Sequence, residues 1–89
     1  MTRRQRKSRI REITQELVQK MQEQFPLVEL IEVEDRPTGT VAIHIYTPYE
    51  DTFAVLDATG TRVVDLSATE EIHVMIVPHH QKKAIHQTA

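Results

Sequence analysis

The sequence predicts an α+β fold in which two helices cover one face of a three-stranded mixed sheet, in the order α-β-β-α-β. Three observations predict it. An apolar stripe with helical spacing runs through residues 8–25, the turn sequence "DRPTG" separates two segments rich in valine and isoleucine, and "TPYE" is typical of a second helix start. With 89 residues, of which 39% are hydrophobic, the chain can bury one modest core, so we expect a single domain.

The first helix is predicted at about residues 8–25. Its stripe consists of apolar residues three or four positions apart: Ile10, Ile13, Leu17, Met21 and Phe25. Ser8 is the predicted N-cap, and Pro26 ends the pattern because proline cannot continue the helical hydrogen bonds. Cations at a helix N-terminus oppose the helix dipole, so residues 1–7 are predicted to form a flexible basic arm.

A β-hairpin is predicted next, with strands at 27–34 and 40–46. Pro37 and Gly39 suit the turn between them, because proline fixes its own φ and glycine tolerates a positive one. In the second strand, three residues are predicted to face the core and three to face away from it. The first set is Val41, Ile43 and Ile45, and the second is Ala42, His44 and Tyr46.

Residues 48–68 support two interpretations. As a helix, the segment has Thr47 as its N-cap, Pro48 at the first position and Glu50 at the third, which together make a capping box. As a second hairpin, it has strands at 53–57 and 62–66 on either side of the turn sequence "DATG". We favour the helix because its start signals agree with one another.

This second helix is predicted to bury one particular face. That face is apolar or small and consists of Phe53, Leu56, Gly60, Val63, Val64 and Ser67. Gly60 within it would permit a close approach of another backbone. The predicted core contains Phe53 of this helix and five residues of the other elements. Its members are Leu17, Met21, Ile43, Ile45, Phe53 and Val74.

The third strand is predicted at 71–77 and to end at Pro78. A right-handed crossover through the second helix makes it parallel to the second strand. Residues 78–89 contain too few apolar side chains to fold, so we expect a disordered tail after a folded domain at 8–77.

This element order, with a basic first helix, resembles the type II KH-like topology and is similar to ribosome-binding factor A and BolA-type proteins over residues 8–77. The resemblance implies binding to RNA. KH domains carry a G-x-x-G loop, whereas this chain has only Gly39 and Gly60, neither in such a motif. No site residue is therefore transferred from these families.

Charge is distributed very unevenly along the chain. The first eleven residues hold no acid and six of the eleven basic residues: Arg3, Arg4, Arg6, Lys7, Arg9 and Arg11. The rest of the chain has five basic and thirteen acidic residues, a net charge of −8, against −2 for the whole chain. The basic segment has three interpretations: it binds nucleic acid or the ribosome, it binds the acidic surface of a neighbouring subunit, or it is a solvated arm without a role.

The sequence contains no motif that indicates catalysis. It has no phosphate-binding glycine loop, nucleophile elbow or two-histidine metal helix, so we expect no enzymatic activity and no cofactor. The absence of cysteine excludes disulfides and thiolate metal sites and favours a cytoplasmic location. His79, His80 and His86 lie in the predicted tail, where we expect only adventitious metal binding and no metal site.

The best candidate site is the sheet face that the helices leave open. Four of its residues, His44, Tyr46, His73 and Met75, predict a contact surface for a second copy of the chain or another protein. A catalytic alternative pairs His44 or His73 with a carboxylate as general base. No apolar run is long enough to span a membrane, and no secretory signal follows the basic start, so no membrane partner is expected.

Overall fold

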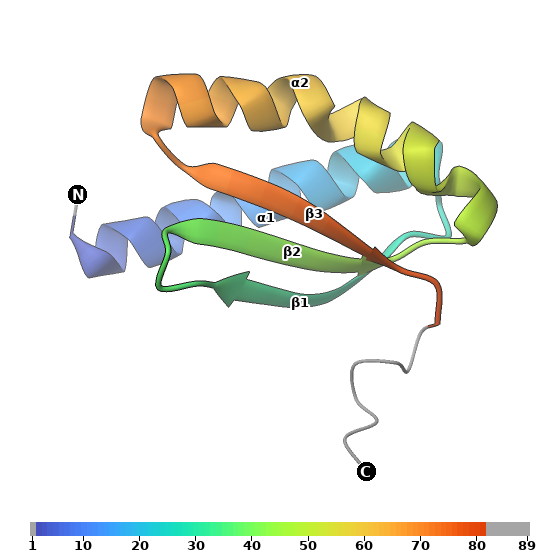
Figure 1. Cartoon of the computed structure of the whole chain (residues 1–89), viewed down its shortest axis with the longest axis horizontal. Coiled ribbons are helices and arrows are strands. Elements are labelled where there is room, and N and C mark those ends of the chain that lie inside the picture. The colour runs from blue at the N-terminus through green and yellow to red at the C-terminus, as the bar shows by residue number, and fades with distance from the viewer. Residues whose placement is uncertain (1, 82–89) are drawn as a thin grey trace, which may run out of the picture.

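Both helices lie on one face of a three-stranded sheet, which confirms the predicted α-β-β-α-β fold (Figure 1). The computed structural model describes residues 2–81. The elements are α1 (Arg3–Gln24), β1 (Glu29–Asp35), β2 (Thr40–Tyr46), α2 (Thr52–Glu70) and β3 (His73–His79), with a short 3₁₀ turn at Tyr49–Asp51. The central strand β2 runs antiparallel to β1 and parallel to β3, as predicted. In this part of the chain, neither helix combines the length and apolar character needed to cross a membrane.

Helix α1 begins at Arg3, five residues earlier than predicted. Thr2 is the N-cap: its Oγ1 accepts a hydrogen bond from the Gln5 amide (3.1 Å), and the Gln5 side chain accepts one from the Thr2 amide (2.8 Å). This reciprocal capping box satisfies backbone donors that would otherwise be free and offsets the unfavourable position of the cations. The predicted start at Ser8 was therefore wrong, and residues 3–7 belong to the helix.

Helix α2 confirms the helical interpretation of residues 48–68, but its start differs from the predicted one. The 3₁₀ turn precedes it, and the Thr52 hydroxyl donates to the carbonyl of Tyr49 (2.8 Å). Thr47 does not cap the helix: Asp51 holds the N-cap position, and the Thr47 hydroxyl donates to the neighbouring Pro48 carbonyl (3.3 Å). The helix ends at Glu70 and is followed by its C-cap, Glu71, which has a left-handed backbone with φ of +57°.

The buried face of α2 is not the predicted one. Val55, Thr59 and Leu66 are buried, whereas Phe53 is 84% exposed. Successive helical residues are about 100° apart, so the true face is rotated by roughly one residue from the predicted face. Thr59 can occupy the buried face because its hydroxyl donates to the carbonyl of Leu56 within the same helix (3.2 Å).

The hairpin and the last strand follow the prediction with small shifts. Gly39 has a φ of +93°, as the predicted turn requires, and β2 has the predicted bounds. Strand β1 carries an irregularity between Leu30 and Glu32 that leaves one extra residue, Ile31, without a partner on β2. Strand β3 does not end at Pro78 but continues to His79, because an edge strand tolerates the missing N–H of proline.

The core lies between the sheet and the two helices. Its buried members are Ile10, Ile13, Leu17, Met21, Val28, Val41, Ile43, Ile45, Val55, Leu66, Ile72 and Val74. Five of the six predicted core residues are among them, and Phe53 is the exception.

Two ion pairs join α1 to α2. The Arg9 guanidinium donates to Glu70 (Nε to Oε1, 2.7 Å), and the Arg62 guanidinium donates to Glu16 (Nε to Oε2, 2.7 Å). The hydrogen bond from Arg62 lowers the pKa of Glu16, and that from Arg9 lowers the pKa of Glu70, in both cases against the opposing effect of burial. Each carboxylate is therefore favoured in its charged form by the fold.

We expect the stability of the protein to fall in acid because of these two carboxylates. A group with a lowered pKa in the folded state contributes stability above its unfolded pKa, near 4.5, and loses it as the pH falls through the folded pKa. Urea denaturation at pH 7 and pH 3 should show the loss, and Glu16→Gln should make it smaller. Glu23→Gln is the control, because Glu23 is an exposed residue of α1 that makes no ion pair within residues 2–81. Equal pH dependence of Glu16→Gln and the wild type would contradict the assignment.

Candidate interaction surfaces

The outer face of the sheet, defined as the side opposite the helices, is one candidate surface. Because Val41, Ile43 and Ile45 of β2 and Val74 of β3 are in the core, the alternate residues point outward. The outward set is Ala42, His44 and Tyr46 of β2 with His73, Met75, Val77 and His79 of β3. No helix or strand within residues 2–81 covers this face (Figure 1).

The centre of the outer face is apolar. Ala42 lies in register with Met75, and His44 with Val77 on the neighbouring strand. Ala42 is fully buried beneath its neighbours, Val77 is half-buried and Met75 is 38% exposed. On the other side, Glu34 and Glu32 of β1 pair with Ala42 and His44, so an acidic row borders the apolar centre.

His44 links the three strands through its two ring nitrogens. Its Nε2 lies 3.1 Å from Oε1 of Glu34 on β1, and its Nδ1 lies 2.9 Å from Nε2 of His79 on β3. Arg36 also contacts Glu34 (3.3 Å). An ionised carboxylate can only accept, so Nε2 of His44 donates to Glu34, and Nδ1 of neutral His44 accepts from His79. The hydrogen bond from His44 lowers the pKa of Glu34.

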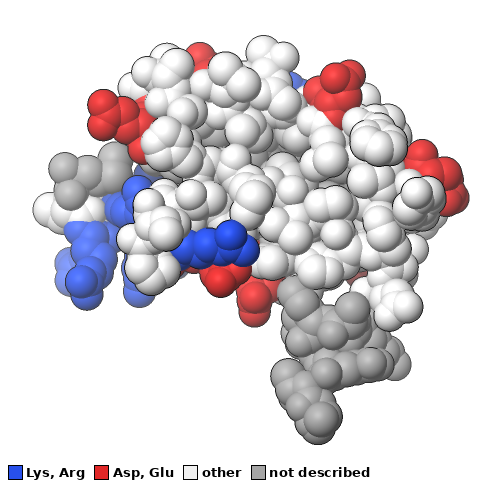
Figure 2. Space-filling model, viewed as in Figure 1, with Lys and Arg blue, Asp and Glu red and all other residues white. Residues whose placement is uncertain are grey.

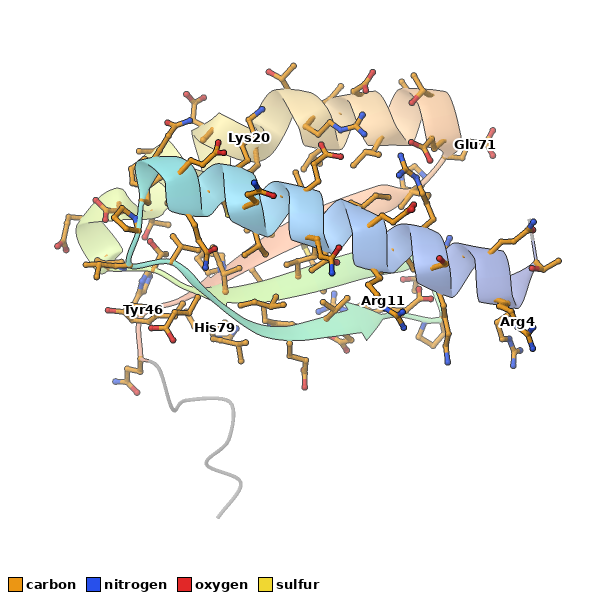
Figure 3. All side chains as sticks on the ribbon, turned by 180° about the vertical axis from the view of Figure 1, so that it is seen from behind. Arg4, Arg11, Lys20, Tyr46, Glu71 and His79 are labelled. Carbon is orange, nitrogen blue, oxygen red and sulfur yellow. The ribbon has the colours of Figure 1, made fainter. Side chains whose placement is uncertain are left out.

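The predicted site residues do not all come together. Tyr46 and His79 are register partners at one end of the sheet, where Figure 3 shows both. His73 lies at the opposite end of β3, and its Nδ1 is 2.9 Å from Oγ of Ser67 on α2. The His73 ring therefore contacts α2, although its strand position alternates with that of the core residue Val74. The structure groups His44 with Glu34 and His79, of which only His44 belonged to the predicted site.

The histidines at the end of β3 have separate partners. His79 contacts His44, whereas Nδ1 of His80 lies 3.1 Å from the carbonyl oxygen of Thr47. His86 lies outside the described residues. Within residues 2–81, no group of three or more histidine and acidic side chains is arranged to hold a metal ion.

The basic residues at the start of α1 form two groups. Arg6 donates to Asp35 (3.1 Å) and to the carbonyl of Gly39 (3.1 Å), and Arg9 donates to Glu70. The other four are exposed and make no ion pair within the described part of the chain: Arg3, Arg4, Lys7 and Arg11. We call these four the cationic stripe.

The cationic stripe is a single surface feature. With about 100° between successive residues, its members fall within an arc of about 100° on α1. Figure 3 shows Arg4 and Arg11 on the side of α1 that faces away from α2, and Figure 2 shows blue side chains gathered at the end of the molecule where α1 begins. Each cation in the first turn opposes the helix dipole by about 0.3–1 kcal/mol at low salt, so the stripe is not explained by helix stability.

Two exposed aromatic residues lie where α2 begins. Tyr49 is in the 3₁₀ turn, and its ring packs edge-to-face against His80 with 5.1 Å between ring centroids. Phe53 follows four residues later and is largely exposed. Phe53 was predicted to lie in the core, so this surface was not predicted.

Comparison of the chain with family models, curated proteins and solved structures gave no match.

Proposed function

We propose that the protein is a small non-enzymatic interaction module that binds a second copy of itself through the outer face of the sheet. The observation that carries the proposal is the apolar surface formed by Met75 and Val77, which no described helix or strand covers. Acidic residues of β1 border this centre, and an apolar centre with a polar rim is the usual anatomy of a protein interface.

The hydrogen bonds of His44 support the same surface. By joining Glu34 on β1 to His79 on β3, they hold the side chains of three strands in fixed positions. A preorganised surface loses less conformational freedom when it binds a partner. The same arrangement leaves His44 fully engaged, which argues for a structural role of this imidazole rather than one as a general base.

Size-exclusion chromatography with light scattering tests the proposal. The wild type should form dimers as its concentration rises, and Met75→Glu should weaken the dimer by at least about tenfold, because an unpaired charge would be buried in the interface. Val64→Glu is the matched control, since Val64 is 68% exposed on α2 and lies away from this face. A monomer at every concentration, or equal effects of the two variants, would contradict self-association.

Binding of nucleic acid is a second candidate, favoured by the four unpaired cations of the stripe. Four phosphate contacts give a slope of about −3.6 for the logarithm of affinity against the logarithm of salt concentration on duplex DNA. Replacing Arg4 and Arg11 with glutamine should reduce the slope to about −1.8, whereas Lys20→Gln, on another side of α1, should leave it unchanged. Fluorescence anisotropy with a labelled duplex measures both, and undetectable binding at low salt would remove this candidate.

A further inference from the structure

The free edge of the sheet at β1 is a place where another strand could be added. The strand order is β1-β2-β3, so β1 pairs with β2 on one side only. The backbone groups on its other side have no strand partner within residues 2–81. Extended peptides bind to such edges through main-chain hydrogen bonds and obtain specificity from alternate side chains.

A groove runs along this edge between β1 and α1. It has a volume of about 510 Å³ and is lined by Lys7, Ile10, Arg11, Thr14, Gln15, Leu30, Val33 and Asp35. Leu30 and Val33 are in register with Ile45 and Ile43 of the core, so they belong to the helix side of the sheet. They are nevertheless 44% and 37% exposed, which gives the groove an apolar floor.

The two sides of this edge carry opposite charges. On the groove side stand Lys7 and Arg11, which have no ion-pair partner in the described part of the chain. The acid of the groove, Asp35, is already paired with Arg6. On the outer side of β1 stand Glu32, which makes no ion pair in the described part of the chain, and Glu34, which contacts Arg36 and His44. Because side chains of a strand alternate between the two faces, an added strand would meet cations on one face and acids on the other.

This arrangement of charges determines which kind of strand can bind at the β1 edge. If β1 paired with β1 of a second copy, the acidic rows would lie side by side, and like charges across strands are destabilising. We propose that the groove binds an extended segment of a partner protein as an added strand. That segment has apolar and acidic residues facing the groove and basic residues at the intervening positions. The site is separate from the outer face and does not depend on self-association.

A synthetic peptide tests the proposal directly. The probe is a capped heptapeptide with lysine at the four odd positions and valine, glutamate and leucine at the even positions, matching the seven residues of β1. The control peptide has the same residues in an order without alternation, so it has the same net charge. We expect the probe to shift the NMR signals of β1 and of the groove side of α1 and to protect β1 amides from exchange. The control should bind at least about tenfold more weakly.

Two matched double variants of the full chain separate this site from general charge attraction. Lys7→Glu with Arg11→Glu reverses the cations of the groove, whereas Arg3→Glu with Arg4→Glu reverses unpaired cations of the same helix that do not line it. The first pair should weaken binding of the probe by at least about tenfold, and the second by less than about twofold. All four residues are exposed, and an unchanged amide spectrum outside α1 would show that both variants fold.

Three results would overturn the proposal. One is equal binding of the two peptides, which would reflect composition alone. Another is a set of probe-induced shifts that avoids β1. The third concerns a single-stranded oligonucleotide that displaces the probe, if both double variants weaken binding of the oligonucleotide equally. The cationic stripe would then act as a nucleic-acid surface, and the groove would have no role of its own.

Discussion

Replacement of Leu17 by alanine is expected to lower the free energy of unfolding by about 2–5 kcal/mol. Leu17 is fully buried in α1, between Ile13 and Met21 on the same apolar stripe. Its removal leaves a cavity among the packed side chains of the core, which relaxes only partially. A domain of this size has about 5–15 kcal/mol of stability in total, so the loss should be evident in urea denaturation followed by circular dichroism.

Phe53→Ala is the control for this measurement and removes an even larger side chain. Because Phe53 is mostly exposed on α2, its loss should change the free energy of unfolding by less than about 0.5 kcal/mol. A loss under about 1 kcal/mol for Leu17→Ala, or a large loss for Phe53→Ala, would mean that the helices pack on the sheet through other faces.

The elements of the fold that could be predicted are those specified by local chemistry. The stripe of α1 has only polar residues opposite it, so its buried face is unambiguous. The hairpin follows from the backbone needs of its turn, where Gly39 has a positive φ. In β2, regular alternation correctly separated Ile43 and Ile45 from His44.

The orientation of α2 could not be predicted in the same way. Apolar residues occur around much of this helix, so several faces were comparably apolar and the sequence pattern did not choose among them. The choice depends on packing against β3 and α1, in which the small polar Thr59 is buried and the large Phe53 is not. That outcome is a tertiary effect with no local signal.

The contacts of the candidate surfaces also depend on distant parts of the chain. His79 reaches His44 only because β3 continues through Pro78, which was expected to end it. Arg6 and Arg9 were counted with the other cations, but their partners Asp35 and Glu70 lie 29 and 61 positions away in sequence. The sequence thus identified the basic segment, and only the fold distinguishes its paired cations from the cationic stripe.

Gly60→Ala is expected to raise the free energy of unfolding by about 1 kcal/mol, in contrast to the close backbone contact predicted from the sequence. Gly60 lies in the interior of α2, and a Cβ built on it meets no atom within 4 Å. Alanine therefore gains helix propensity there without a clash. The change should appear as a higher urea concentration at the unfolding midpoint, with an unchanged m-value.

Gly39→Ala provides a matched comparison with the opposite sign. A Cβ at Gly39 also meets no atom within 4 Å, so the two sites are equally free of steric conflict. They differ in backbone conformation, because the φ of +93° at Gly39 is strained for any residue with a side chain. We expect Gly39→Ala to lower the free energy of unfolding by about 1–2 kcal/mol. If both variants changed the free energy of unfolding in the same direction, backbone conformation would not explain the difference between these two glycine positions.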